Sequence, residues 1–218
     1  MNTAHYHSIA NSLPPAVKLV VVSKMRPAAQ IEALYNAGQK IFGENRPHEL
    51  KAKYELLPKD IEWHFIGHLQ TNKIKFIAPF VSIIHSIDSF SLLQEVNRHA
   101  EKNHRIIPCL LQFFIAQEST KYGLSMEECV EILENPFFST LKNVKIIGVM
   151  GMATFTDDKI LIQKEFKKLH EYFMQLKTGY FLNSPDFKEV SMGMSDDYEI
   201  AIAEGSSIVR IGSAIFDN

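Results

Sequence analysis

Eight short apolar runs, rich in β-branched and aromatic residues, alternate along the chain with stretches of helical periodicity. The runs cover residues 17–23, 40–44, 62–67, 81–86, 105–115, 143–150, 187–193 and 206–212. They are continuous rather than alternating in polarity, which is typical of parallel strands covered on both faces. Eight strand–helix repeats in 218 residues favour a single (β/α)8 barrel of the TIM type, with one domain over residues 1–218.

Helix signals fill the intervals between the runs. Proline in the first turn and Gly38 at the end bound a helix over residues 27–38, and Ser195 and Gly205 predict the N-cap and the end of the last one. The N-terminal segment that contains His5 and His7 is expected to be mobile. The alternative fold is a doubly wound open sheet, but the chain lacks the GxGxxG sequence that would follow its first strand.

The composition excludes several classes of protein. A formal net charge of −2 gives no basic excess for nucleic acid or an anionic membrane. No apolar run approaches the roughly 18 residues of a membrane span, and the N-terminus lacks the features of a secretory signal. Cys109 and Cys129 are isolated, which is typical of buried thiols in a reducing compartment. We therefore expect a cytoplasmic protein that binds neither nucleic acid nor membranes.

Polar residues gather where the predicted strands end. A barrel builds its site from the loops at the carboxyl ends of its strands, and a set rich in Gly, Ser and Asn with one Lys and one Arg suits a phosphorylated ligand. The loops after the last two strands often bind phosphate, and here they contain Ser191 with Gly193 and Gly212 with Ser213. The alternative is that these are ordinary turn glycines and capping serines.

Two cations at strand ends each allow two interpretations. Arg210, flanked by Val209 and Ile211, needs an acceptor, which is either a carboxylate across the barrel or a heteroatom of a ligand. Lys24 either reaches out to water or is desolvated at the barrel mouth and acts as a nucleophile. A nucleophilic lysine beside a phosphate site permits a covalent link to a sugar phosphate, as in class I aldolases, or to pyridoxal 5′-phosphate (PLP).

Three other features are given structural interpretations. His64 and His68 have the spacing of a helical metal site but lie on a strand and its end, so no metal is predicted. Asp196 and Asp197 are expected at the first turn of a helix, where they favour its dipole. Lys121 is expected either near the mouth of the pocket or in a solvated loop.

Seven sequence motifs occur together in one order: VVVSK, FGEN, IEWHFIGHLQTNK, HSID, ESTKYGL, SMGMSDDYEIAIAEGS and VRIGSAIF. In these motifs the chain resembles the pyridoxal phosphate homeostasis proteins of the YggS/PROSC type over nearly its whole length. The resemblance implies the fold-type III PLP barrel, which also forms the N-terminal domain of alanine racemase.

The resemblance also implies a role for individual residues. Lys24 would form the internal aldimine with PLP, and Arg210 would face the pyridine nitrogen. The remaining cofactor-binding residues would be Asn45 near the ring and, at the phosphate, Ser191, the backbone of Met192, Gly212 and Ser213. Met150 would pack near the ring. Met25 and Arg46 depart from the family pattern, which puts contacts behind the cofactor in doubt rather than the covalent link.

The function implied is intracellular handling of PLP, by carrying and buffering it and delivering it to apo-enzymes. Arginine at the pyridine nitrogen makes the ring a poorer electron sink. The sequence given ends at Asn218, so we expect no C-terminal β domain to supply a second base, and no efficient catalysis. The alternatives are an amino-acid racemase and, more distantly, a class I aldolase. A monomer or weak homodimer is expected.

Overall fold

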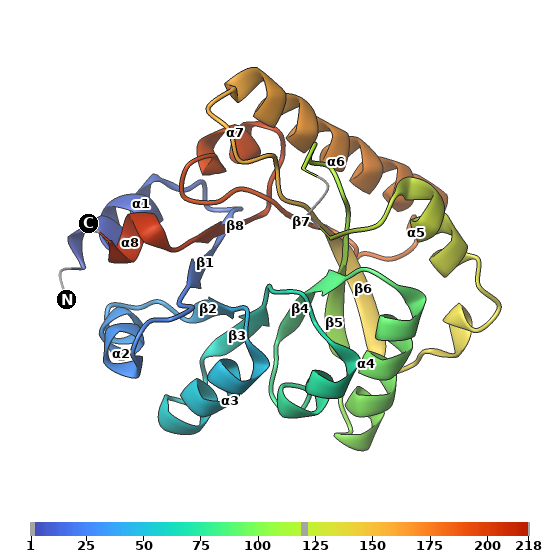
Figure 1. The fold of residues 1–218 in the computed structure, drawn as a ribbon, viewed down its shortest axis with the longest axis horizontal. Coiled ribbons are helices and arrows are strands. Elements are labelled where there is room, and N and C mark those ends of the chain that lie inside the picture. The colour runs from blue at the N-terminus through green and yellow to red at the C-terminus, as the bar shows by residue number, and fades with distance from the viewer. Residues whose placement is uncertain (1–2, 119–121, 218) are drawn as a thin grey trace.

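A closed barrel of eight parallel strands forms the centre of the molecule, with helices around it (Figure 1). The structure is a computed structural model, and it describes residues 3–118 and 122–217. Neighbouring strands follow the order of the chain, and β1 closes the barrel by pairing with β8. The predicted (β/α)8 barrel is therefore confirmed, and the open doubly wound sheet is excluded.

Each strand overlaps the apolar run that predicted it, because a strand buried on both faces needs a continuous apolar sequence. The bounds are β1 Lys18–Val22, β2 Ile41–Glu44, β3 Glu62–Phe65, β4 Ile83–Ile87, β5 Ile107–Gln112, β6 Val144–Met150, β7 Glu189–Ser191 and β8 Ile208–Ile211. Strand β7 is the shortest, and it pairs with β8 through a single register position, Ser191 opposite Ile208.

The helices follow the strands as the alternation predicts. The α-helices are α1 Ala4–Ser12, α2 Ala28–Asn36, α3 Pro47–Leu56, α4 Phe90–Lys102, α5 Met126–Leu133, α6 Lys159–Gly179, α7 Tyr198–Ala203 and α8 Ser213–Phe216. The described residues also form two 3-10 segments: η1 Thr71–Phe76, which replaces an α-helix between β3 and β4, and η2 Phe138–Thr140.

Three expectations about local structure have different outcomes. The segment before β1 forms α1 and buries Tyr6, so the expectation of a mobile N-terminus is wrong. Gly205 follows the end of α7 with φ +93°, which confirms the predicted stop. Ser195 does not cap α7, because Asp197 occupies the N-cap position and the Ser195 side chain bonds elsewhere.

Aromatic and branched side chains fill the barrel and the layer between its strands and helices. Trp63, Phe65 and Phe166 are among the largest fully buried side chains. Cys109 and Cys129 are both free and buried, as expected, and burial raises the pKa of the Cys129 thiol to about 12. Among the helices of the described ranges, none is both long and apolar enough to cross a bilayer.

Candidate functional site

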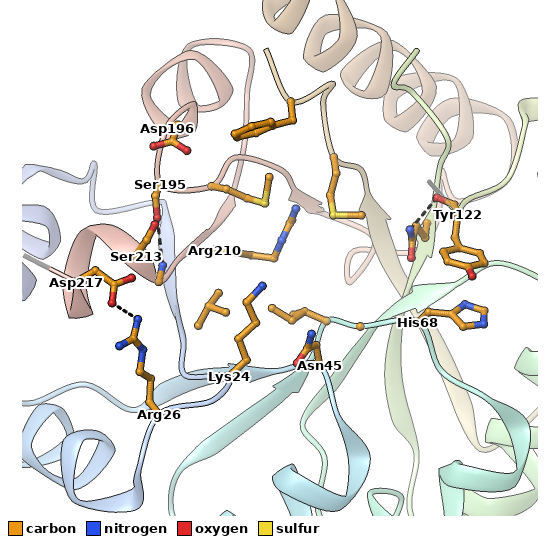
Figure 2. Close-up of a pocket in the computed structure, with 18 residues that line it drawn as sticks. Lys24, Arg26, Asn45, His68, Tyr122, Ser195, Asp196, Arg210, Ser213 and Asp217 are labelled. Atoms are coloured by element: carbon orange, nitrogen blue, oxygen red, sulfur yellow. Dashed lines mark hydrogen bonds and ion pairs between the residues drawn. The ribbon is translucent and has the colours of Figure 1, made fainter. Parts of the chain in front are cut away.

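A pocket of about 470 Å³ opens at the carboxyl end of the barrel strands (Figure 2). This is the end at which a TIM barrel carries its site. Its lining includes five of the seven residues that the sequence predicted for the cofactor, namely Lys24, Asn45, Arg210, Gly212 and Ser213. Ile66, Met152 and Met194 add apolar surface.

Lys24 lies two residues beyond the end of β1, in a turn closed by a hydrogen bond from the Arg26 amide to the Ser23 carbonyl (3.0 Å). Figure 2 shows its side chain extending into the pocket between Arg210 and Asn45. Lys24 is exposed, so of the two alternatives that the sequence left open, the structure favours a lysine that reaches water over a desolvated one. The fold orients the Lys24 side chain so that its primary amine lies in the pocket.

Ser195 and Ser213 meet at one corner of the pocket, where the loop after β7 lies beside the start of α8. The amides of Gly212 and Ala214 each lie 3.4 Å from Ser195 Oγ. Hydroxyl and amide groups thus gather at the ends of the last two strands, which is where barrels often hold phosphate.

Ser191 and Met192 do not line the pocket, although the sequence placed both at the phosphate. Ser191 is fully buried, and its Oγ accepts a hydrogen bond from Arg210 Nη1 at 2.6 Å. The Met192 amide donates a hydrogen bond to the carbonyl of Ile208, at 3.1 Å. The chain keeps pairing with β8 through Gly193, whose carbonyl accepts from the Arg210 amide, and reaches the mouth only at Met194 and Ser195.

Arg210 lies 3% exposed at the floor of the pocket. Besides Ser191 Oγ, its guanidinium donates to the carbonyl oxygen of Gly151 at 3.1 Å. Both acceptors are neutral, so the expected alternative of a hydrogen-bonded carboxylate is not what these contacts show. Burial lowers the pKa of Arg210 to about 10, with the Asp197 charge opposing the shift. A buried guanidinium held by neutral oxygens favours an electron-rich ligand atom in the pocket.

A hydrogen-bonded chain continues from Arg210 into the barrel. Ser191 Oγ lies 3.0 Å from His85 Nδ1, and His85 Nε2 lies 3.0 Å from His64 Nδ1. Arginine only donates, so the Ser191 oxygen accepts from Arg210; in the arrangement that also uses the Ser191 proton, Ser191 donates to His85 Nδ1 and His85 Nε2 donates to His64 Nδ1. Burial lowers the pKa of both imidazoles, that of His64 to about 3. The two histidines are therefore neutral, and each accepts at Nδ1.

Asn45 brings an unused acceptor to the pocket. Its Oδ1 is buried and has no hydrogen-bond partner among the residues that the structure describes. A buried polar atom without a partner costs free energy, and a ligand donor at this position would recover it. The orphaned oxygen therefore indicates that the wall of the pocket is made to contact a polar group.

The rim opposite Lys24 carries His68 stacked on Tyr122, with ring centroids 4.1 Å apart. His68 Nδ1 also lies 3.3 Å from an Asp88 carboxylate oxygen. Within residues 3–118 and 122–217, no group of three or more His, Cys, Asp or Glu residues could hold a metal. Lys121, which the sequence placed near this mouth or in a loop, lies outside the described residues.

Sequence reasoning missed Ser195 as a site residue because it read this serine as a helix cap. The chain has two serines in SMGMSDD, four residues apart, and the assignment depends on where β7 leaves the sheet. The usable signal is Gly193, which lies between the two serines with φ +95° and turns the chain towards the mouth.

Comparisons with known proteins agree with this geometry. The chain matches the family described as alanine racemase, N-terminal domain, over residues 3–217. The pyridoxal phosphate homeostasis protein of Aquifex aeolicus is 40% identical over 200 residues, covering 91% of this chain and 86% of the relative. The protein of the same name from Synechocystis is 37% identical over 216 residues, covering 97% and 95%.

Solved structures give the same neighbours. PipY of Synechococcus elongatus without PLP superposes with a TM-score of 0.90 at 34% identity, covering 99% of this chain and all of that chain. The PLP-bound form of PipY gives a TM-score of 0.86 at 33% identity, covering 98% and 99%. Alanine racemase of Bartonella henselae, at 18% identity and a TM-score of 0.75, shares the fold over 98% of this chain and 60% of its own.

Proposed function

Since the chain belongs to the family of pyridoxal phosphate homeostasis proteins, we propose that it binds PLP in the pocket at the carboxyl end of its barrel and holds it covalently through Lys24. In this role it carries and buffers PLP in the cytoplasm and delivers it to apo-enzymes. It acts as one domain, as a monomer or weak homodimer, and without efficient catalysis. The observation that carries the proposal is a primary amine directed into the same pocket as a two-serine corner and a buried guanidinium.

The pocket residues fit each part of PLP. Ser195, Ser213 and the amide of Gly212 would hold the phosphate, and this replaces the assignment to Ser191 and Met192. Arg210 would donate to the pyridine nitrogen, and Asn45 Oδ1 would accept from the ring substituent nearest it. The pocket, at about 470 Å³, lies within the usual size range of small-molecule sites.

PLP supplies an aldehyde that condenses reversibly with a primary amine, and this masks the free aldehyde without consuming it. The residues of the chain favour retention over turnover. Arg210 only donates, so a pyridine nitrogen facing it receives a hydrogen bond but no proton, and the ring withdraws electrons less strongly. Ser195 and Ser213 anchor the phosphate end and Lys24 the aldehyde end, so PLP is held from two sides.

The visible absorption spectrum tests the proposal. Purified protein titrated with PLP should develop a yellow band that borohydride bleaches, and peptide mass mapping should place one pyridoxyl phosphate group on the peptide containing Lys24. A protein that stays colourless with excess PLP would refute binding, and the class I aldolase reading would then be tested with sugar phosphates.

The racemase alternative has one observation in its favour, the stacked His68 and Tyr122 on the rim opposite Lys24. Either ring could exchange a proton with a bound amino acid. Incubation of the PLP-loaded protein with L-alanine and other L-amino acids, followed by chiral chromatography, separates the two functions. Formation of the D-enantiomer at an enzymatic turnover would contradict the carrier function, and we expect none above the rate of free PLP.

Removal of the two corner hydroxyls should weaken PLP binding selectively. The Ser195→Ala/Ser213→Ala double variant loses two hydrogen bonds to a charged phosphate, worth about 1.5 kcal/mol each, so the Kd for PLP should rise about 100-fold. The Kd for pyridoxal, which has no phosphate, should change little. Both values can be measured from the visible band in the same titration.

The same pair of ligands tests the assignment made from sequence. Ser191→Ala removes a buried partner of Arg210 but no group that lines the pocket. The ratio of the PLP and pyridoxal affinities should therefore match that of the wild type. If the preference for PLP over pyridoxal fell in Ser191→Ala and was kept in the double variant, Ser191 rather than Ser195 and Ser213 would be the phosphate-binding residue.

A further inference from the structure

Lys53 is a buried lysine on α3, behind the strand end that carries Lys24. Its side chain is 7% exposed, and its ammonium lies 2.7 Å from the Ser23 carbonyl oxygen, 2.6 Å from Glu44 Oε1 and 2.7 Å from Glu49 Oε1. An ammonium has three N–H donors, and these three acceptors use all of them. Lysine is rarely buried without such pairing.

The turn that presents Lys24 is held on both sides of that residue. On the near side, the Ser23 amide donates to the Gly43 carbonyl (3.0 Å), and the Ser23 carbonyl accepts from Lys53. On the far side, the Met25 amide donates to Glu49 Oε1 at 2.6 Å. The two backbone groups that flank Lys24 are thus tied, through Lys53 and Glu49, to the same helix.

Met25 shows that the turn needs this support. Its φ is +61°, in the left-handed region that a non-glycine residue adopts only at a cost in free energy. Its side chain is 74% exposed, so packing of that side chain does not hold the backbone there. The Met25 amide, by contrast, is held by Glu49, in addition to the hydrogen bond from the Arg26 amide to the Ser23 carbonyl that closes the turn.

Glu44 completes the network from β2. Its Oε1 also accepts from the Ser23 hydroxyl at 2.6 Å, and Glu44 is fully buried. Burial raises the pKa of Glu44, which Lys53 and Ser23 oppose. Burial also raises the pKa of Glu49, but hydrogen bonds from Lys53 and the Met25 amide outweigh it and leave that pKa below its ordinary value. Glu49 is therefore an ionised acceptor for both donors.

We propose that Lys53 and Glu49 form a clamp that positions Lys24, by fixing the strained turn from which its amine enters the pocket. The inference rests on the proposed function, because it concerns how the chain meets the PLP aldehyde. A lysine side chain is long and flexible, so a fixed backbone reduces the freedom that must be lost when its amine bonds covalently. Neither residue lines the pocket, so both act through Lys24.

The clamp can be opened without leaving a buried charge unpaired. Glu49→Ala removes the acceptor of the Met25 amide and keeps the Lys53–Glu44 ion pair, whereas Glu49→Gln keeps a carbonyl acceptor. Lys53→Met combined with Glu44→Gln removes the buried cation together with its buried anion. Lys51→Met is the matched control, since Lys51 lies exposed on the same helix and pairs with Glu55 at 3.6 Å.

Two ligands separate positioning of Lys24 from a general loss of structure. PLP condenses with the amine, whereas pyridoxine 5′-phosphate has an alcohol in place of the aldehyde and cannot. Glu49→Ala and the Lys53→Met/Glu44→Gln double variant should bind PLP about tenfold more weakly, because one more residue must be ordered on binding. Both variants should bind pyridoxine 5′-phosphate with the affinity of the wild type. Glu49→Gln and Lys51→Met should stay within about twofold of the wild type for both ligands.

Amide hydrogen exchange in the PLP-free protein provides the second readout. The Met25 and Arg26 amides should exchange at least about tenfold faster in the two clamp variants, and at the wild-type rate in Glu49→Gln and Lys51→Met. Faster exchange with an unchanged PLP affinity would overturn the positioning role and leave the proposed function standing. Equal weakening for both ligands would overturn it as well, because the defect would be general. Failure of the wild type to take up PLP would overturn the proposed function and, with it, this role.

Discussion

Replacing Lys24 by alanine should abolish covalent attachment of PLP and leave the barrel folded. Lys24 is exposed, and among the described residues it makes no hydrogen bond or ion pair that its loss would break. Surface substitutions of this kind usually change the free energy of unfolding by less than about 0.5 kcal/mol. After borohydride treatment, the mass of intact Lys24→Ala should equal that of the untreated protein, whereas the wild type should gain one pyridoxyl phosphate group.

Three measurements make this result decisive. Urea unfolding should give the same midpoint for Lys24→Ala and the wild type, which excludes misfolding. Pyridoxine 5′-phosphate should still bind to Lys24→Ala, because the Ser195–Ser213 corner and Arg210 are unchanged. Lys51→Ala removes an exposed lysine of α3 instead, and this variant should be modified at Lys24 to the same extent as the wild type. A borohydride-stable adduct at another lysine in Lys24→Ala, formed as fast as in the wild type, would contradict the assignment.

The position of Lys24 was predictable from sequence, but its environment was not. An apolar run that ends in Ser23–Lys24 predicts the end of a parallel strand, and the carboxyl end of a barrel strand is where sites lie. Whether the Lys24 amine is shielded from water depends on how the turn after Lys24 faces the mouth of the pocket. Here Met25 takes a left-handed conformation, which sequence reasoning reserves for glycine and so did not anticipate.

The loop that brings a serine to this corner of the pocket was predictable from sequence, but the serine itself was not. Both serines of SMGMSDD follow an apolar run, and the run does not say at which residue the chain leaves the sheet. Hydrogen bonds to β8 continue past Ser191 to the carbonyl of Gly193. That pairing is a tertiary contact between distant segments, so it carries no local signal, and it moves the pocket-lining serine from Ser191 to Ser195.

The sequence position of Lys53 contained a signal for a buried ion pair that the sequence analysis did not use. It lies three residues after Leu50 and four before Leu57, both buried, and so occupies the apolar face of α3. A lysine at such a position requires a buried partner. The helix pattern alone predicts that requirement, but only the fold shows that the partners are Glu44 and the turn that carries Lys24.

Lowering the pH from 7 to 5 should destabilise the protein through His64 and His85, with about 2 kcal/mol expected from His64. Burial, together with the charge of Lys18, lowers the pKa of His64 to about 3, and burial, His64 and Arg210 lower that of His85. In the unfolded chain both pKa values return to about 6.5. Above pH 6.5 both states are neutral and the histidines contribute no pH dependence. Below it the unfolded chain binds protons that the folded chain excludes, so both histidines lower the stability of the folded state, His64 by about 2 kcal/mol at pH 5.

The free energy of unfolding in urea, measured between pH 7.5 and 5, tests this expectation. The His85→Gln variant has no group that titrates at this position, so whatever the stability of this variant at pH 7, its free energy of unfolding should fall less than that of the wild type over the same range. His5→Gln, which removes an exposed histidine of α1, should keep the wild-type slope. A wild-type free energy that is flat between pH 7 and 5 would mean that the two histidines are not held neutral.

The direction of the hydrogen bonds explains why protonation is costly at this place in particular. When Ser191 accepts from Arg210, its own proton is available to His85 Nδ1 as long as that nitrogen is unprotonated. A second proton on His85 would remove the acceptor of Ser191 and place a cation near Arg210 in a buried site. The chain that holds the guanidinium at the pocket floor therefore exists only while both imidazoles are neutral. Acid should accordingly disorder the ligand-facing end of Arg210 together with the barrel interior, and the affinity for pyridoxine 5′-phosphate should fall over the same pH range.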